Sequence, residues 1–510
     1  MKAKFLERID PVILAIALLN IAVRLLVFNN LEYHRDELLY LSLGQHPDFG
    51  YNSVPPLIGW ISWLIQNIFG NNLFAVRLFP ALLGGVMIFL VASMARELGG
   101  SRYSSILTAI GLSVSIFFMR SYFLFQPVHI EIFLWTLCIW LIIKFINTSK
   151  DRFLIYFGIA AGLALLNKYL SGLLFTGLLF IIPFTRYRNI FKKGSFWAGI
   201  IAGGLIFLPN LIWQTAKGFP VINHMSDLYD TQLVHMDVAT FLTEQIISPY
   251  AGSILVIGGL LFLFFSEKMK NFRFLGFLAF FIIIALMLLK GKGYYTLGIY
   301  PMMIAAGGVA YDTWLRNRAA RVILPLFMVL MTVTVVPIGL PVLNKDGLKT
   351  YFKVLDEKYG IDLGRRFEDG TIHTLPQDYA DMIGWEELTI LADSAYSMIG
   401  DKQAAFIYGE NYGHAGAITV IGKKYGLPEA VSFHESFSYW FPRQFNTEIT
   451  SMVYINDEIG DDVRALFGRI TLVGAVSDPD AREYGTSVYL CEEPVSSFNV
   501  FWEERTKDIR

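Results

Sequence analysis

Residues 73–95 read LFAVRLFPALLGGVMIFLVASMA, a run in which Arg77 is the one charged side chain. A run of about 20 apolar residues is long enough to cross the hydrocarbon core of a bilayer as a helix. Ten more apolar stretches lie at about 11–29, 103–119, 130–147, 153–167, 169–184, 196–213, 249–266, 272–289, 294–314 and 321–340. We therefore predict a polytopic α-helical membrane protein with about 11 spans.

The composition agrees with this fold class and indicates a second domain. The 510 residues are 54% hydrophobic and 17% charged, whereas soluble domains carry about 25% charged residues. The net charge of −1 gives no indication of a nucleic-acid partner, so none is expected. From about Asn344 the pattern becomes that of a soluble α/β domain, with strands expected at 404–408, 450–455, 470–476 and 487–491 and helices at 377–399 and 411–425. We predict a transmembrane module, residues 1–343, and a soluble domain, residues 344–510.

The positive charges alternate between the loops of the two sides. One side carries Lys2, Lys4, Arg8, Arg96, Arg102, Lys150, Arg152, Arg186, Arg188, Lys192, Lys193, Lys268, Lys270, Arg273, Arg316, Arg318 and Arg321. The other carries only Arg35, Arg120, Lys168, Lys217, Lys290 and Lys292. Since short cytoplasmic loops are rich in Lys and Arg, the first set is expected in the cytoplasm. The protein is then a multi-pass protein of the inner or plasma membrane, with a cytoplasmic N-terminus, an uncleaved first span and an extracytoplasmic C-terminal domain.

The first external loop, residues 30–72, contains two adjacent carboxylates. It begins Tyr33-His34-Arg35-Asp36-Glu37-Leu38-Leu39-Tyr40. Its two amphipathic stretches, 36–43 and 56–68, are too short to span and suit the membrane interface. Acids in the first turn of a helix also favour the helix dipole, and position alone gives that structural role about even odds.

Other ionisable residues on the external side strengthen the catalytic alternative. Glu131, two residues after His129, stands at the head of an apolar helix, where ionisable groups are usually functional or paired. Lys168 lies between two apolar helices with almost no loop. The run Lys290-Gly291-Lys292-Gly293-Tyr294-Tyr295 offers lysines and open backbone N–H groups, which suit a phosphate. The structural alternatives are a helix-start acid, a snorkelling lysine and an ordinary basic turn.

Several short motifs resemble those of one family. They are Asp36-Glu37-x-x-Tyr40, Pro55-Pro56-Leu57, Phe69-Gly70, Ala75-Val76-Arg77-Leu78, Leu165–Tyr169 and Lys292–Pro301. In this order, over about residues 10–315, they resemble the protein O-mannosyltransferase and aminoarabinose-transferase superfamily, whose members have the GT-C fold. The stretch 409–417 resembles the extracytoplasmic domain of bacterial members, and no catalytic role is assigned to it. The site predicted with this resemblance has Asp36 and Glu37 as catalytic residues, Glu131, His129 and Tyr40 at the donor or acceptor sugar, and Lys168, Lys290, Lys292, Tyr294 and Tyr295 at the donor phosphate.

The resulting hypothesis is an inverting glycosyltransferase that uses a polyprenyl-phosphate sugar. A carboxylate would deprotonate the acceptor hydroxyl, and cations would stabilise the departing phosphate. The expected partners are the lipid-linked sugar, membrane lipid and an acceptor glycan, lipid or protein. A divalent cation between Asp36 and Glu131 stays an alternative without dedicated ligand spacing, so no cofactor or metal is assigned.

Two other functions remain open at this point. A transporter or lipid flippase also has many spans and a few intramembrane charges, although here the ionisable residues gather on one face and no repeated halves are visible. An inactive family member serving as a scaffold is the second alternative. The intact Asp36, Glu37 and Lys292 argue against it.

Overall fold

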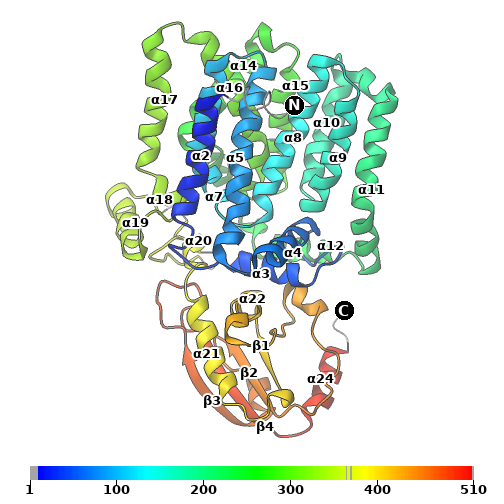
Figure 1. Ribbon diagram of the computed structural model, residues 1–510, viewed down its shortest axis with the longest axis vertical. Helices are drawn as coiled ribbons and strands as arrows, with labels where there is room; N and C mark the ends of the chain where they lie inside the picture. The colour runs from blue at the N-terminus through cyan, green and yellow to red at the C-terminus, as the bar shows by residue number, and fades with distance from the viewer. Residues whose placement is uncertain (1–9, 363, 368–369, 508–510) are drawn as a thin grey trace. The chain divides into compact units, whose positions relative to one another are not determined.

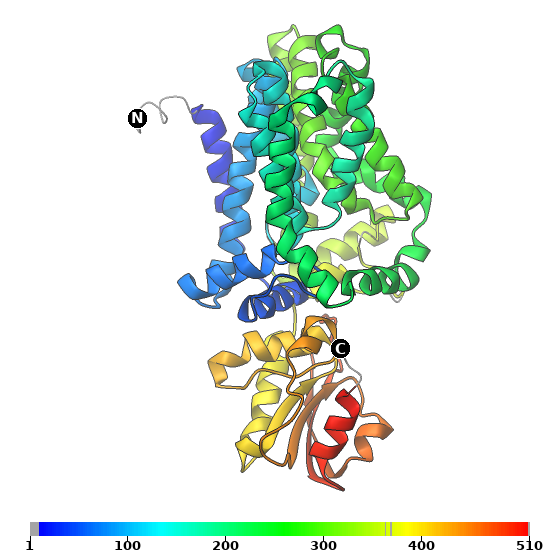
Figure 2. The same ribbon diagram turned by 90° about the vertical axis from the view of Figure 1, so that its right-hand side faces the viewer.

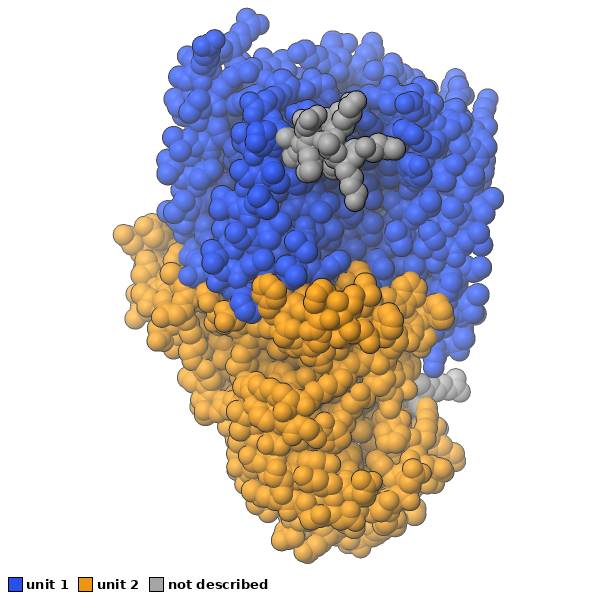
Figure 3. All heavy atoms as spheres, in the orientation of Figure 1, with its two compact units in different colours: residues 1–28, 54–57, 77–342 blue, residues 29–53, 58–76, 343–510 orange. Residues whose placement is uncertain are grey.

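A computed structural model describes residues 10–362, 364–367 and 370–507 and divides them into two compact units. Unit 1 comprises residues up to 28 together with 54–57 and 77–342, and unit 2 comprises 29–53, 58–76 and 343–510 (Figure 3). Most of the first external loop therefore groups with the C-terminal region. Lys2, Lys4 and Arg8, used for the predicted orientation, lie outside the described residues.

Unit 1 consists of helices, many of which lie side by side (Figure 1, Figure 2). Each of the 11 predicted apolar stretches coincides with helical structure, and the stretch 103–119 falls on two helices. The helices are α2 (Pro11–Leu26), α5 (Leu73–Glu97), α6 (Arg102–Ser113), α7 (Ile116–Ser121), α8 (Pro127–Thr148), α9 (Arg152–Asn167), α10 (Ser171–Ile181), α11 (Gly194–Ala216), α12 (Pro220–Thr231), α13 (Val238–Ile247), α14 (Ser253–Phe265), α15 (Arg273–Leu288), α16 (Tyr300–Trp314), α17 (Arg318–Val333) and α18 (Val336–Gly339).

Several of these helices have the length and composition of membrane spans. Within the described part of the chain, α5, α8 and α11 are each long and apolar enough to cross a membrane. The consecutive segments Val238–Ile247 and Tyr250–Phe265, bent by 85°, would together make a fourth. Helices α2, α9 and α15 are apolar but shorter. The helical architecture of this unit is thus confirmed, while the number of 11 spans stays a prediction.

Glycines allow close packing in the helical unit. Gly158 and Gly162 on α9 face Gly199 and Gly203 on α11, and a Cβ atom on Gly158 would lie 2.0 Å from the Gly199 carbonyl oxygen. Small residues four apart let helix backbones approach closely in membranes, where lipid supplies little hydrophobic drive for helix association. Larger side chains at these positions would push α9 and α11 apart.

Unit 2 is an α/β structure with a four-stranded sheet. Its strands β1 (Ala405–Gly409), β2 (Ser451–Asn456), β3 (Phe467–Ala475) and β4 (Ser487–Pro494) lie in the order β1-β2-β4-β3. Strands β1 and β2 are parallel, and the other two pairs are antiparallel. All four predicted strands are confirmed, with ends shifted by up to three residues.

The helices of unit 2 include the two in the first external loop. They are α3 (Arg35–Gln45), α4 (Leu57–Phe69), α19 (Lys345–Tyr359), α20 (Gln377–Ala380), α21 (Trp385–Ser397), α22 (Tyr412–Val420), α23 (Asp461–Arg464) and α24 (Phe498–Thr506). The helix predicted over 377–399 is interrupted between α20 and α21, where Gly384 adopts a φ of +93°. Helix α22 packs on α3, because a Cβ atom on Gly416 would lie only 3.0 Å from the Cβ of Leu38. This contact brings the predicted acidic pair next to the C-terminal part of the chain.

Candidate active site

The start of α3 separates the two predicted catalytic carboxylates. The His34 Nδ1 atom accepts a hydrogen bond from the Asp36 backbone N–H (3.1 Å), and Glu37 Oε2 accepts one from the His34 backbone N–H (2.9 Å). These two bonds form a capping box, which satisfies backbone donors at the first turn of the helix. Glu37 is also fully buried. The structure thus gives Glu37 a role in holding the start of α3.

Asp36 makes a different contact. Its Oδ1 atom accepts a hydrogen bond of 3.0 Å from the Tyr412 hydroxyl at the start of α22. The guanidinium carbon of Arg35 lies 4.4 Å from the centre of the same tyrosine ring. Asp36 therefore contacts a polar group of another element, while its neighbour Glu37 stabilises the helix to which both belong.

His34 links α3 to two further carboxylates. Its Nε2 atom lies 3.8 Å from Asp381 and 3.9 Å from Asp378. Burial alone would lower the pKa of His34, but the nearby Asp378 and the charges of Asp36 and Asp381 raise this pKa above its ordinary value. Burial also raises the pKa of Asp381. The Nδ1 atom of the imidazole thus caps α3, while its Nε2 atom faces two carboxylates at ion-pair distance.

A second charged group lies beside Arg35. Glu483 is 3.9 Å from Arg35 Nε and 2.8 Å from His414 Nε2. Burial would raise the pKa of Glu483, but its hydrogen bond with His414 and the nearby charges of His414 and Arg35 hold this pKa below the ordinary range. The ionised carboxylate thus pairs with Arg35 and His414 and links α3 to α22.

Glu435 is a carboxylate that the sequence analysis did not single out. Its backbone adopts a φ of +55°, a left-handed conformation that is uncommon for residues other than glycine. Its side chain is hydrogen-bonded to Ser53 and Asn52 of the first external loop, and burial raises its pKa to about 7, with a further contribution from Asp36. Strained backbone and carboxyl groups that titrate near neutral pH both occur often at functional sites.

Unit 1 brings four other predicted residues together. Lys168 Nζ lies 3.0 Å from Glu131 Oε2, and the two side chains are 24% and 4% exposed. The same ammonium group lies 5.4 Å from the ring centre of Tyr294 and 4.8 Å from that of Tyr295. Lys168 is thus held by a carboxylate and two aromatic rings, an arrangement that suits an ammonium group at reduced solvent exposure.

The remaining two lysines contact the segment between α12 and α13. Lys292 Nζ donates a hydrogen bond to Gln232 Oε1 (2.5 Å), and Lys290 Nζ donates one to the Val234 carbonyl oxygen (2.9 Å). These contacts join the loop of Lys290 and Lys292 to the segment around Gln232 and Val234. A phosphate-binding role for the two lysines stays a prediction.

Two residues predicted at the sugar are packed inside the protein. His129 is fully buried, with its ring 5.7 Å from Phe79, 6.1 Å from Phe125 and 6.2 Å from Tyr122. Tyr40 is buried in α3. Both positions indicate a packing role in this structure, because neither side chain presents appreciable surface to a ligand.

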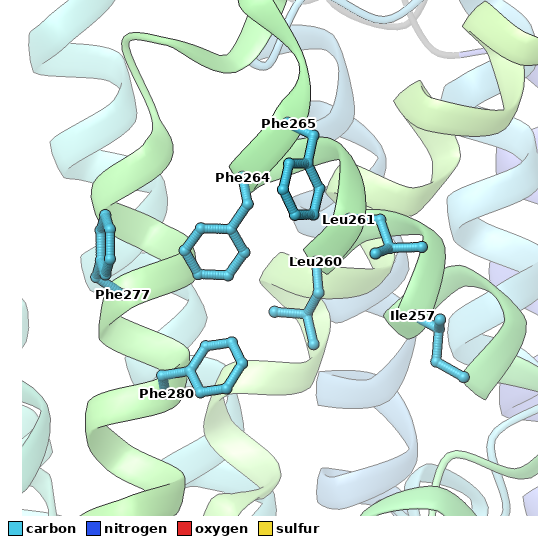
Figure 4. Close-up of a pocket in the computed structure, with 7 residues that line it drawn as sticks. All are labelled: Ile257, Leu260, Leu261, Phe264, Phe265, Phe277 and Phe280. Atoms are coloured by element: carbon cyan, nitrogen blue, oxygen red, sulfur yellow. The ribbon is translucent and has the colours of Figure 1, made fainter.

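Neither of two cavities in the structure includes a predicted site residue. The first, about 530 Å³, is lined by Ile257, Leu260, Leu261, Phe264, Phe265, Phe277 and Phe280 of α14 and α15 (Figure 4). Its wholly apolar lining is typical of a surface that contacts lipid. The second, about 240 Å³, lies in unit 2 beside His46, Glu429 and Trp440. Within the described ranges, no three His, Cys, Asp or Glu side chains group so as to hold a metal ion.

Tyr412, His414, Glu435 and Glu483 were not predicted as site residues from the sequence. The stretch 409–417 entered only as a resemblance to the extracytoplasmic domain of bacterial family members. Tyr412 and Asp36 are 376 positions apart. No periodicity or local spacing connects positions so distant, so an Asn-Tyr-Gly-His cluster at a helix start was the only available signal.

Comparison of the sequence with known proteins gives three matches. Residues 53–213 match the family model of the dolichyl-phosphate-mannose-protein mannosyltransferases. An uncharacterised protein of Aquifex aeolicus is 32% identical over 164 residues, which is 31% of this chain and 32% of that protein. Lipid A galacturonosyltransferase RgtD of Rhizobium johnstonii is 24% identical over 221 residues, which is 40% of this chain and 43% of that enzyme. The match thus spans less than half the length of either relative.

The crystal structure of ArnT from Cupriavidus metallidurans bound to undecaprenyl phosphate shares the fold over nearly the whole chain. It superposes with a TM-score of 0.61 and covers 94% of this chain and 97% of its own, at 14% sequence identity. At this identity the likeness shows the fold alone. Together with the family match, it confirms the GT-C-like fold and the resemblance inferred from the sequence motifs.

Proposed function

We propose that this chain, a GT-C-type relative of the polyprenyl-phosphate-sugar glycosyltransferases, transfers a sugar from a polyprenyl-phosphate donor to an acceptor hydroxyl. The acceptor is an envelope glycan, a lipid or a protein. The observation that carries the proposal is the difference between Asp36 and Glu37. Glu37 is committed to the helix cap, whereas Asp36 meets the Tyr412 hydroxyl outside the cap. A carboxylate held in this way suits a general base.

The reaction that suits these groups is a single displacement at the anomeric carbon. Asp36 takes the proton of the acceptor hydroxyl as its oxygen attacks that carbon. The bond between the carbon and the phosphate oxygen breaks, and the phosphate leaves with the electron pair. A phosphate leaving group is already anionic and needs no proton, so one carboxylate base is sufficient. Attack opposite to the leaving group inverts the configuration.

The phosphate would be bound by the lysines of unit 1. We assign Lys168, Lys290 and Lys292 to the phosphate. The phenol groups of Tyr294 and Tyr295 would add hydrogen-bond donors to it. Glu131 is then the group that holds Lys168 in place while no donor is bound. As the glycosidic bond breaks, charge accumulates on the departing oxygen, and positioned cations stabilise that charge. The lipid named for the ArnT structure, undecaprenyl phosphate, supports this class of donor.

The proposed location is the outer face of the inner or plasma membrane. This location rests on the distribution of Lys and Arg among the loops. Reporter fusions test it directly, because a reporter at Lys270 should be cytoplasmic and one after Asn344 extracytoplasmic. If both reporters show the same side, the span count is off by an odd number and the outer-face assignment fails.

The test of function is a transfer assay with the purified full chain. Lipid extracted from the purified protein is first identified by mass spectrometry, and the polyprenyl-phosphate class is expected. Polyprenyl-phosphate sugars are then supplied with candidate acceptors, and the product linkage is determined by NMR. Transfer with inversion supports the proposal. Movement of the lipid-linked sugar across proteoliposomes without transfer would instead identify a flippase, and binding with neither activity would identify a scaffold.

A further inference from the structure

The start of α22 is held rigidly by its own side chains. Asn411 Oδ1 accepts hydrogen bonds from the backbone N–H groups of Gly413 (2.8 Å) and His414 (3.1 Å). His414 Nε2 lies 3.0 Å from Asn411 Nδ2 and 2.8 Å from Glu483 Oε2. An Asn at this position is a favourable helix cap. The first residue of the helix, Tyr412, is therefore fixed in direction.

The side chain of Tyr412 is fixed as well. Its backbone N–H donates to His434 Nδ1 (3.2 Å), and the two rings are 5.3 Å apart. The guanidinium carbon of Arg35 lies over the tyrosine ring, 4.4 Å from its centre. A Cβ atom on Gly413 would lie 2.9 Å from Arg35 Nε and 2.7 Å from Trp385, so the glycine leaves room for this stacking.

The hydroxyl of Tyr412 keeps its proton at neutral pH. Burial, together with the charge of Asp36, raises the pKa of Tyr412 well above its usual value. The hydroxyl is therefore a donor to Asp36 Oδ1 at 3.0 Å. A hydrogen bond to an ionised group contributes more than one between neutral groups, and it fixes the direction of the acceptor.

We propose that Tyr412 is a positioning residue for Asp36, supplied to the reaction by the C-terminal α/β part of the chain. This inference rests on the proposed function, in which Asp36 is the base. By donating to one carboxylate oxygen, Tyr412 holds the carboxylate in a single orientation. During transfer the acceptor hydroxyl proton moves to Asp36, while Tyr412 retains its own proton. The α/β region is then a working part of the transferase.

The test compares Tyr412→Phe with a matched control in the same unit. Phenylalanine keeps the ring that stacks on Arg35 and removes only the hydroxyl. Tyr454→Phe is the control, because Tyr454 is also buried and donates to a carboxylate, Glu410 (3.1 Å). Tyr412→Phe should lower kcat by about 10- to 100-fold, the range for loss of a hydrogen bond to a charged group, with donor KM unchanged. The control should retain full turnover.

A conservative replacement and a double variant separate positioning from a structural role. Incorporation of 3-fluorotyrosine at position 412 keeps the hydroxyl donor and nearly the same shape, so this variant should retain turnover. This second substitution keeps the test open if the phenylalanine variant folds poorly. In an Asp36→Asn background, Tyr412→Phe should cause no further loss.

The possible failures are distinguishable. Near-normal transfer by Asp36→Asn would remove the proposed base and, with it, the proposed function. An inactive Asp36→Asn combined with normal turnover in Tyr412→Phe would leave the function standing and overturn the role of Tyr412. Losses that multiply in the double variant would also overturn it, because Tyr412 would then act independently of Asp36.

Discussion

Asp36 and Glu37 are adjacent carboxylates, and we expect substitution of the first to affect transfer and substitution of the second to affect stability. In Asp36→Asn the shape of the side chain is kept and its oxygen can still accept from Tyr412, but the group no longer takes a proton. The capping box of α3 involves His34 and Glu37 and does not include the Asp36 side chain. We therefore expect Asp36→Asn to lose transfer with little change in thermal stability, and Glu37 variants to lose stability first.

The sizes of the two effects follow from the contacts. General-base catalysis contributes about 10²- to 10⁴-fold, so Asp36→Asn should reduce kcat by at least about 10²-fold, or about 2.7 kcal/mol in barrier height. Glu37→Ala removes the 2.9 Å bond to the His34 backbone N–H from a fully buried position. Loss of a helix cap costs about 0.5–2 kcal/mol. Glu37→Gln can still accept that bond, so its turnover should stay within a few-fold of the wild type.

The assay measures single-turnover transfer and thermal unfolding of each purified variant in the same detergent or nanodisc. Single-turnover conditions separate the chemical step from product release. A fall of 10²-fold or more in Glu37→Gln, with Asp36→Asn close to wild type, would reverse the assignment and make Glu37 the base. Normal transfer by both variants would exclude Asp36 and Glu37 as the base, and Glu435 and Glu131 would be the next carboxylates to test.

Three further predictions concern the other ionisable groups. Lys168→Met should destabilise the protein by up to about 3 kcal/mol by leaving Glu131 buried without its lysine; Lys168→Met with Glu131→Gln should restore the melting temperature but not transfer, and recovery of both would mean that the pair is structural. Lys292→Met should lower kcat more than donor affinity, since the cation acts most on the departing phosphate; unchanged kinetics would show that it only fastens Gln232. The pKa of Glu435 rises from 4.5 to about 7 on folding, so the folded state holds an extra proton between these pH values. The stability of the wild type relative to Glu435→Gln should therefore fall by at most about 3 kcal/mol as the pH rises from 5 to 8. A difference in melting temperature that does not depend on pH would contradict the raised pKa.

The helices of unit 1 and the strands of unit 2 were predictable because their signals are local. A run such as residues 73–95 has no favourable place in water. The short apolar run at 452–455, which is rich in β-branched and aromatic residues, indicates a buried strand in the same direct way. The ends were less predictable. The stretch 103–119 divides into α6 and α7. The helix expected over 377–399 is interrupted before Trp385, where Gly384 adopts a left-handed φ of +93°.

The grouping of the first external loop with the C-terminal region could not be predicted. It depends on contacts such as Leu38 with Gly416 and Asp36 with Tyr412, which join positions more than 370 residues apart. Each residue is ordinary in its local sequence. Only the fold makes Gly416 a site of close approach and Tyr412 the partner of a carboxylate.

Glu131 and Lys168 show why the sequence left both functional and structural interpretations open. Each residue alone fitted a structural role, as a helix-start acid and a snorkelling lysine. The structure pairs them, with Lys168 Nζ 3.0 Å from Glu131 Oε2. Such a pair is weak support for stability as such, because desolvation of two ions offsets much of their attraction. A lysine paired in this way still keeps its charge where an anion can compete for it, with Tyr294 and Tyr295 beside it. Binding of the donor's phosphodiester anion would then displace Glu131 from Lys168, so the carboxylate would keep Lys168 in place before binding and weaken donor binding by the cost of that displacement.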